Sequence, residues 1–216
     1  MKRDFQLDLY LVTDRGLTRD RPLIDIVEAA VQGGVTMVQL REKKCSTREF
    51  INLAHQIKKI LKTHRIPLII NDRLDIALAV DADGVHIGQS DMPYEITRRI
   101  LGPEKIIGLS VESLHDAEQA ETRDVDYLGV SPIYFTPTKT DLKQELGLEG
   151  LRTIAAFSRH RLVGIGGLNA ANVTEVIRAG AEGAAVVSAI CSADDPLQST
   201  RNLLHIIQAA KSGSVS

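Results

Sequence analysis

The sequence repeats one pattern along its length, a short apolar run followed by a longer amphipathic stretch. Most runs are almost continuously apolar and rich in β-branched residues, which is typical of parallel strands buried on both faces. About eight runs alternate with about eight helical stretches, which predicts an α/β fold with a (β/α)8 TIM barrel. An open doubly wound sheet usually has about five or six strands. The expected strands cover residues 9–12, 36–40, 67–70, 84–87, 106–109, 127–130, 162–165 and 184–187.

Apolar side chains recur at helical spacing between these runs, for example over residues 24–31 and 50–61. Ser46 or Thr47 is the expected N-cap of the second helix, and Pro196 indicates the start of the last one. No linker rich in Pro, Gly or Ser divides the 216 residues. We therefore expect a single barrel domain over residues 1–216, with a loose tail after about residue 210.

The composition argues against several classes of protein. A net charge of −2, an aromatic content of 4% and the absence of Trp argue against a nucleic-acid binder. No apolar run approaches the roughly 18 residues of a membrane span, and the start of the chain lacks the apolar segment of a signal peptide. We expect a cytoplasmic protein that binds no membrane. Cys45 and Cys191 are expected to be free thiols.

In a barrel of this kind, the chemistry is carried by the carboxyl ends of the strands and the loops that follow them. Arg41 and Lys43 follow the second expected strand, and alternation along an extended segment puts both on the same side. An arginine fork and a lysine point charge suit phosphate oxygens. The alternative is a solvated, charged turn.

Acidic residues follow the next two strands. Asn71 and Asp72 end the third strand, and Asp91 follows the fourth. Mg²⁺ prefers a few carboxylates together with water and substrate phosphate oxygens, so the acids and the nearby cations together predict a diphosphate substrate and Mg²⁺. The alternative interpretation is that these residues cap the helices that follow.

Polar and glycine-rich segments follow the later strands. Ser110, after the fifth strand, has no sequence pattern that makes it a convincing nucleophile. The longest loop, 131–141, is expected to cover an active site. Gly166 and Gly167 follow the seventh strand, at the place where barrels build phosphate sites, although a glycine pair is often a plain turn.

Other polar residues have simpler interpretations. His86 lies inside a strand and is expected to be a hydrogen-bonded group of the core or the barrel interior. Glu42 and Arg73 are expected to pair with neighbouring charges. The other histidines are expected at the surface: His55, His64, His115, His160 and His205.

Taken in order, the strand-end motifs resemble those of thiamine-phosphate synthase, and the resemblance spans about residues 10–190. One departure is Ser131, where many members have glycine. The matching motifs are Tyr10-Leu11-Val12-Thr13-Asp14, Gln39-Leu40-Arg41-Glu42-Lys43, Asn71-Asp72, Gly88-Gln89-Ser90-Asp91-Met92-Pro93, Gly108-Leu109-Ser110, Thr136-Pro137-Thr138-Lys139, Gly166-Gly167 and Val187-Ser188.

The resemblance implies an Mg²⁺-dependent transferase. It would join 4-amino-2-methyl-5-hydroxymethylpyrimidine diphosphate to 4-methyl-5-(2-phosphoethyl)thiazole, giving thiamine monophosphate and diphosphate. It further implies that Asp72 and Asp91 bind Mg²⁺. The implied pyrimidine-diphosphate site comprises Gln39, Leu40, Arg41, Glu42, Lys43, Asn71, Ser110 and Lys139. The implied thiazole-phosphate site comprises Thr136, Pro137, Thr138, Gly167, Val187 and Ser188, and the expected catalytic residues are Arg41, Lys43, Ser110 and Lys139.

Two other functions stay open on the sequence. A related barrel, a thiazole tautomerase, needs a proton shuttle rather than a metal ion and a diphosphate. A non-catalytic sensor of a phosphate ligand would need only the pocket after the last two strands, which leaves the cationic and acidic residues across the barrel without a purpose. The sequence predicts no oligomeric state.

Overall fold

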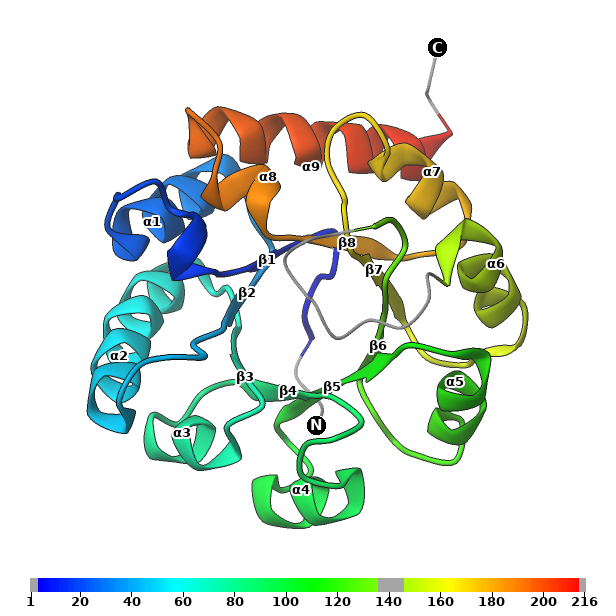
Figure 1. Ribbon diagram of the computed structural model, residues 1–216, viewed down its shortest axis with the longest axis horizontal. Coiled ribbons are helices and arrows are strands. Elements are labelled where there is room, and N and C mark those ends of the chain that lie inside the picture. The colour runs from blue at the N-terminus through cyan, green and yellow to red at the C-terminus, as the bar shows by residue number, and fades with distance from the viewer. Residues whose placement is uncertain (1–3, 136–145, 214–216) are drawn as a thin grey trace.

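The computed structural model describes residues 4–135 and 146–213. Eight parallel strands follow one another around a closed barrel, with β8 paired to β1 (Figure 1). This confirms the predicted (β/α)8 fold. The strands are β1 (Leu9–Val12), β2 (Met37–Leu40), β3 (Leu68–Asn71), β4 (Gly84–Ile87), β5 (Ile106–Val111), β6 (Tyr127–Val130), β7 (Leu162–Ile165) and β8 (Gly183–Val186).

Helices form a ring outside the strands (Figure 1). A capping box starts α2, in which the Ser46 hydroxyl accepts from the Glu49 amide and the Glu49 carboxylate accepts from the Ser46 amide. The helices are α1 (Leu23–Gly33), α2 (Thr47–His64), α3 (Leu74–Ala79), α4 (Tyr94–Leu101), α5 (Leu114–Ala120), α6 (Gly147–Phe157), α7 (Val173–Arg178), α8 (Ser188–Cys191) and α9 (Pro196–Ser212), with a 3-10 helix η1 (Arg15–Leu17) after β1.

The last helix begins where the sequence indicated. Asp195 caps α9 and Pro196 occupies its first turn, as the sequence indicated. The helix continues to Ser212 and ends at Gly213 in the left-handed conformation. None of the helices in residues 4–135 and 146–213 is long and apolar enough to cross a membrane.

Two apolar clusters hold the barrel together. The larger lies between the outer face of the strands and the helices. The smaller fills the barrel interior and is built around Tyr10, Met37, Ile69, Tyr127 and Val163. All five of these side chains are almost fully buried, so the barrel has a packed interior rather than a pore.

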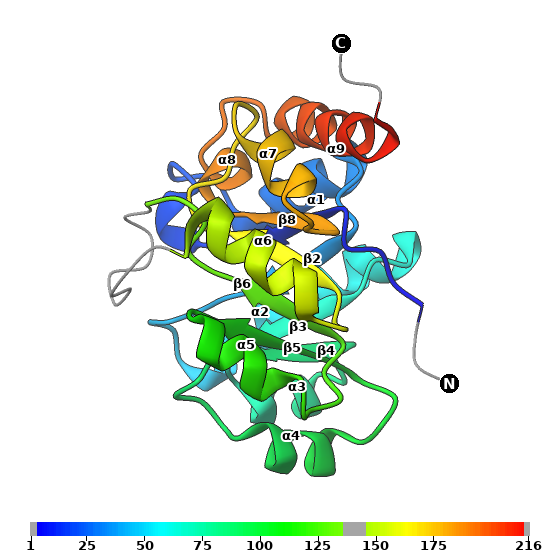
Figure 2. The same ribbon diagram turned by 90° about the vertical axis from the view of Figure 1, so that its right-hand side faces the viewer.

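The segment before β1 lies at one end of the barrel, and α8 lies towards the other (Figure 2). Leu7 belongs to the interior cluster, and the Phe5 ring meets the Tyr127 ring edge to face at 6.4 Å between centroids. The Arg161 guanidinium lies 4.4 Å from the centre of the Phe5 ring and donates to the Phe5 carbonyl. This packing covers the amino-terminal end of the interior, while a pocket opens at the carboxyl ends of the strands.

Candidate active site

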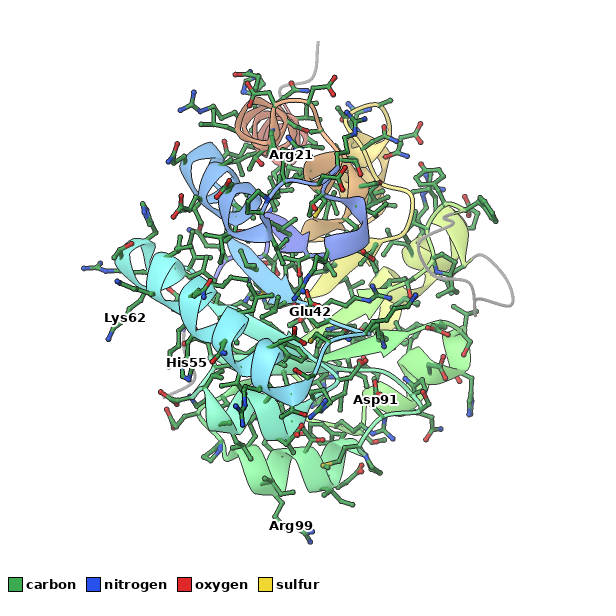
Figure 3. The ribbon with its side chains drawn as sticks, turned by 60° about the vertical axis from the view of Figure 1, so that its left-hand side comes forward. Arg21, Glu42, His55, Lys62, Asp91 and Arg99 are labelled. Carbon is green, nitrogen blue, oxygen red and sulfur yellow. The ribbon has the colours of Figure 1, made fainter. Side chains whose placement is uncertain are left out.

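The pocket has a volume of ≈ 730 Å³, and every strand or the loop after it contributes to its lining. It contains most of the predicted site residues: Gln39, Arg41, Lys43, Asn71, Asp72, Asp91, Ser110, Gly167, Val187 and Ser188. Figure 3 shows Asp91 on the loop after β4, whereas His55, Lys62 and Arg99 project from the outer faces of α2 and α4. The residues expected in the loop after β6, Thr136, Pro137, Thr138 and Lys139, lie outside the described residues.

The alternation of β2 divides the stretch from Gln39 to Lys43. Gln39, Arg41 and Lys43 face the pocket. The Leu40 side chain instead packs in the cluster between strands and helices, and the Glu42 carboxylate pairs with Arg15 at 3.2 Å. The structure therefore does not bring these two side chains to the pocket, because successive residues of an extended segment point to opposite faces.

Arg41 and Lys43, the cations that line the pocket among the described residues, each pair with an aspartate. The Arg41 guanidinium lies 3.0 Å from an Asp14 carboxylate oxygen, and the Lys43 ammonium lies 2.6 Å from one of Asp72. The Lys43 side chain is half exposed, so its pair with Asp72 contributes little to the stability of the fold. Both cations therefore line the pocket, each held by an ion pair at its rim.

Asp91 lies beside Asp72. Its carboxylate accepts a hydrogen bond of 2.7 Å from the Gly88 amide. Burial raises the pKa of Asp91, and the neighbouring Asp72 carboxylate raises this pKa further, against the Gly88 amide and the Lys43 ammonium, which lower it. The Asp72 carboxylate therefore opposes the ionisation of Asp91, and a cation bound by both carboxylates would remove this cost.

The helix-cap interpretation of these aspartates is wrong. The N-cap of α3 is Arg73 and that of α4 is Pro93, and neither makes a side-chain capping bond. Asp72 has a φ of 59°, in the left-handed region, so the chain turns sharply at the end of β3. This turn directs its carboxylate to Lys43.

Uncharged polar side chains lie deeper in the barrel. Nε2 of Gln39 donates a hydrogen bond of 2.8 Å to the Tyr10 hydroxyl. The Tyr10 hydroxyl in turn lies 2.8 Å from the Tyr127 hydroxyl. Nδ1 of His86 lies 2.9 Å from the Tyr127 hydroxyl, and its Nε2 lies 2.8 Å from Oγ of Ser110. His86 is thus a hydrogen-bonded group of the barrel interior, as predicted.

Several other expectations can be compared with the structure. Glu42 and Arg73 each pair with a neighbouring charge, as predicted. Cys45 and Cys191 are free, as predicted. His160 is not a surface residue, because its side chain is only 6% exposed and its Nε2 lies 3.0 Å from the Ala120 carbonyl.

On the opposite side of the pocket, Gly166 and Gly167 both have positive φ, 106° and 65°. A Cβ on Gly167 would lie 2.7 Å from the Phe135 carbonyl oxygen, and one on Gly166 would lie 3.0 Å from Pro132. The amide of Tyr134 donates to the Gly166 carbonyl at 3.1 Å. The glycine pair therefore allows the start of the β6–α6 connection to approach the end of β7, beside Val187 and Ser188 in the pocket wall.

In the described part of the chain, no three His, Cys, Asp or Glu side chains are grouped so that they could hold a metal ion. A Mg²⁺ site does not require three such side chains, because Mg²⁺ often uses one or two carboxylates and takes its other ligands from water and substrate phosphates. The facing carboxylates of Asp72 and Asp91 fit that donor set.

Comparison with known proteins identifies the family. The family model for thiamine monophosphate synthase matches residues 9–190. The chain belongs to this family. It is 54% identical over 203 residues to the thiamine-phosphate synthase of Albidiferax ferrireducens, covering 94% of this chain and 93% of that protein. It is 44% identical to the thiamine-phosphate synthase of Clostridium novyi, covering 94% and 100% of the two chains.

A solved structure agrees with this assignment. Thiamine phosphate pyrophosphorylase from Pyrococcus furiosus matches with a TM-score of 0.87 and 39% sequence identity, covering 94% of this chain and 96% of that one. The resemblance inferred from the strand-end motifs is confirmed, and the chain is a transferase of thiamine biosynthesis.

Sequence reasoning missed three contributors to the pocket region. Asp14, the partner of Arg41, and the pair Tyr10 and Tyr127 were assigned no role. Alternation along β1 offered a signal for Tyr10, because a polar ring inside an apolar strand needs a partner for its hydroxyl. The partner itself lies 117 residues away in the sequence, so only the closed barrel identifies it.

Proposed function

We propose that the chain transfers the pyrimidinylmethyl group of 4-amino-2-methyl-5-hydroxymethylpyrimidine diphosphate to the ring nitrogen of 4-methyl-5-(2-phosphoethyl)thiazole. The observation that carries this proposal is a single pocket with two unlike halves. One half has cations and paired carboxylates at the ends of β2, β3 and β4, and the other has the glycine pair and Ser188 after β7 and β8. Two anionic substrates that meet over one barrel need such an arrangement.

The thiazole nitrogen already carries a lone pair, so the protein does not need a base to create the nucleophile. The C–O bond between the methylene and the diphosphate breaks, its electron pair leaves with the diphosphate, and a C–N bond forms at the same carbon. The aminopyrimidine ring supports positive charge at that carbon. The demand on the protein is therefore to bind and neutralise the leaving group.

We assign that task to Arg41, Lys43, Asn71, Ser110 and Lys139. Arg41 and Lys43 lie on one side of the extended segment after β2, where a fork and a point charge can contact different diphosphate oxygens. Asn71 and Ser110 add uncharged donors from the two sides of His86. Lys139, assigned from the family motif, adds a third cation.

The charge balance of the described residues favours Mg²⁺ as a partner of the diphosphate. Arg41 and Lys43 face three carboxylates, those of Asp14, Asp72 and Asp91, so these five side chains carry a net charge of −1. A diphosphate would meet no net attraction from this group alone. We propose that Asp72 and Asp91 hold Mg²⁺, which supplies positive charge to the diphosphate when it is bound.

We assign the thiazole phosphate to the other half of the pocket. Gly167, Val187 and Ser188 line that half, and the family motif adds Thr136, Pro137 and Thr138. Binding there would place the thiazole nitrogen opposite the methylene carbon and convert a collision of two substrates into a local step. Location in the cytoplasm and independence from nucleic acids and membranes stay predictions.

The test is to incubate the purified chain with both substrates and Mg²⁺ and to follow the release of diphosphate. We expect release that depends on both substrates and stops with a chelator. Activity that survives chelation would remove Mg²⁺ from the proposal. Binding of the thiazole phosphate without turnover would favour the sensor function instead, and isomerisation of a thiazole carboxylate phosphate without diphosphate release would favour the tautomerase.

A further inference from the structure

The hydrogen-bonded side chains beneath the pocket form one continuous chain across the barrel, from Gln39 through Tyr10, Tyr127 and His86 to Ser110. Both tyrosines are fully buried, and Gln39 is only 4% exposed. The residues that the family resemblance implies in the substrate site include the two ends of this hydrogen-bonded series, Gln39 and Ser110, whereas the three residues between them have been given no role in binding or catalysis.

The number of hydrogens available determines which group donates and which accepts in each of these hydrogen bonds. The Gln39 amide donates to the Tyr10 hydroxyl, so the single hydrogen of Tyr10 is left to donate to Tyr127. Tyr127 then accepts from Tyr10, and in the part of the chain that the structure describes the acceptor within reach of its own hydrogen is Nδ1 of His86. The opposite assignment would leave a tyrosine hydrogen unpaired in the fully buried interior, at a cost of about one to two powers of ten in population.

The same count fixes the histidine and the serine. Nδ1 of His86 accepts from Tyr127, so in a neutral imidazole the ring hydrogen sits on Nε2 and is donated to Oγ of Ser110. The Ser110 hydroxyl accepts that hydrogen bond and keeps its own hydrogen for a group in the pocket, which it lines. A ligand therefore meets Ser110 as a hydrogen-bond donor.

A glycine in β5 leaves the space that these hydrogen-bonded side chains occupy. Gly108 pairs with His86 on one side and with Tyr127 on the other, in register across β4, β5 and β6. A Cβ on Gly108 would lie 2.3 Å from the Tyr127 hydroxyl oxygen and 2.5 Å from Nδ1 of His86. Any side chain here would occupy the position of the Tyr127–His86 hydrogen bond.

We infer that Tyr10 and Tyr127 are positioning residues that fix the His86 tautomer with its hydrogen on Nε2, and thereby hold the Ser110 hydroxyl as a donor to the substrate. That Ser110 meets the substrate rests on the proposed function. The state of the His86 ring does not, because it follows from contacts within the protein.

The first test is the tautomer of His86 in the full chain, read from the nitrogen chemical shifts of its imidazole by NMR. We expect the form with hydrogen on Nε2 in the wild type and a mixture of tautomers in Tyr127→Phe, which removes the hydroxyl but keeps the ring. Tyr94→Phe is the matched control, because the Tyr94 hydroxyl accepts from the Asp124 amide on the outside of the barrel. A wild-type ring with its hydrogen on Nδ1, or a ring that Tyr127→Phe leaves unchanged, would overturn the inference.

The second test is a double-mutant cycle between Tyr127→Phe and Ser110→Ala. In the wild-type background we expect Tyr127→Phe to lower kcat/KM about tenfold, the effect of one misdirected hydrogen bond. In the Ser110→Ala background it should have almost no further effect on kcat/KM, while its loss of thermal stability persists. A purely structural role for Tyr127 would instead give the same tenfold loss in both backgrounds.

The two tests separate this inference from the proposed function. If the protein shows no diphosphate release, the Tyr127→Phe and Ser110→Ala cycle is repeated with the dissociation constant of the pyrimidine diphosphate as the measured quantity. Independent effects of the two substitutions on that constant would refute the role of Ser110. The failure of synthase activity with a fixed His86 tautomer would count against the proposed function alone.

Discussion

Replacement of Asp91 by Asn should make the metal-free protein more stable while it weakens the binding of Mg²⁺. In the wild type, the Gly88 amide donates a hydrogen bond of 2.7 Å to the Asp91 carboxylate. The side-chain oxygen of Asn can still accept this hydrogen bond. The substitution removes a charge that burial and the Asp72 carboxylate both disfavour. A residue that serves only the fold would respond in the opposite way, because its loss would cost stability.

The sign follows from the pKa of Asp91, which is raised in the folded protein above its ordinary value of 3.8. Such a carboxyl contributes stability below the unfolded pKa, and this contribution is lost as the pH rises through the folded pKa. Two unit charges about 4 Å apart repel by about 1 kcal/mol in water and about 4 kcal/mol at a protein surface. The Lys43 ammonium, 2.6 Å from Asp72, offsets much of this repulsion. We therefore expect Asp91→Asn to stabilise the metal-free protein by about 1 kcal/mol at neutral pH, fading towards acid pH.

The assay is urea or thermal unfolding with a chelator and with Mg²⁺. At a concentration of 100 times the dissociation constant, Mg²⁺ should stabilise the wild type by about 2.7 kcal/mol, which is about 5 to 10 °C in a chain of this size. The Asn variant should show a much smaller rise at the same concentration. A variant that is less stable than the wild type in chelator, or that gains as much from Mg²⁺, would refute the reasoning.

Asp81→Asn is the matched control, and it should change the stability of the protein in the opposite direction. Hydrogen bonds from Lys105 and Lys58 lower the pKa of Asp81 from 3.8 to about 2. This carboxyl contributes stability above its unfolded pKa and loses it as the pH falls through about 2. Its side chain is 75% exposed, so the loss on substitution should be about 0.5 to 1 kcal/mol at neutral pH and independent of Mg²⁺.

Three further predictions address the other elements of the site and the fold. Lys139→Ala should lower turnover without a matching loss in the free energy of unfolding, and unchanged turnover would remove Lys139 from the mechanism. Gly167→Ala should weaken thiazole-phosphate binding, measured by calorimetry, and destabilise the protein by about 1 kcal/mol or more, because φ is 65° and the new Cβ would lie 2.7 Å from the Phe135 carbonyl. Ser46→Ala breaks the capping box of α2 and should cost about 1 kcal/mol of stability with no change in turnover, so a loss of turnover at constant stability would contradict this purely structural role.

The fold was largely predictable because the signal for each strand is local. Strands buried on both faces are apolar at most positions, and each of the eight observed strands lies in or overlaps an expected run. The differences lie at the ends. β5 extends to Val111, so Ser110 lies within the strand rather than in the loop after it. The four-residue helix α8 is too short to show a helical period.

The site was predictable only where it depends on position along a strand. Alternation correctly put Arg41 and Lys43 on one side, and the same alternation explains why Leu40 and Glu42, included from the family motif, point elsewhere. The partners of the cations were not predictable in this way. Asp14 meets Arg41 because β1 pairs with β2, a contact that no local pattern within either strand encodes.

The depth of each polar group in the barrel follows the cost of burying it. Within residues 4–135 and 146–213, the hydrogen-bonding side chains at the buried level of the barrel interior, those of Tyr10, Tyr127 and Gln39, are uncharged. Arg41, Lys43 and Asp72 keep part of their surface exposed at the rim. An uncharged ring can be bound in the deep layer by directed hydrogen bonds, but a diphosphate cannot, because a buried charge without full compensation costs several kcal/mol or more. The pyrimidine ring of the proposed substrate should therefore point inward and its diphosphate outward, where Mg²⁺ can enter and the leaving group can depart without crossing the barrel interior.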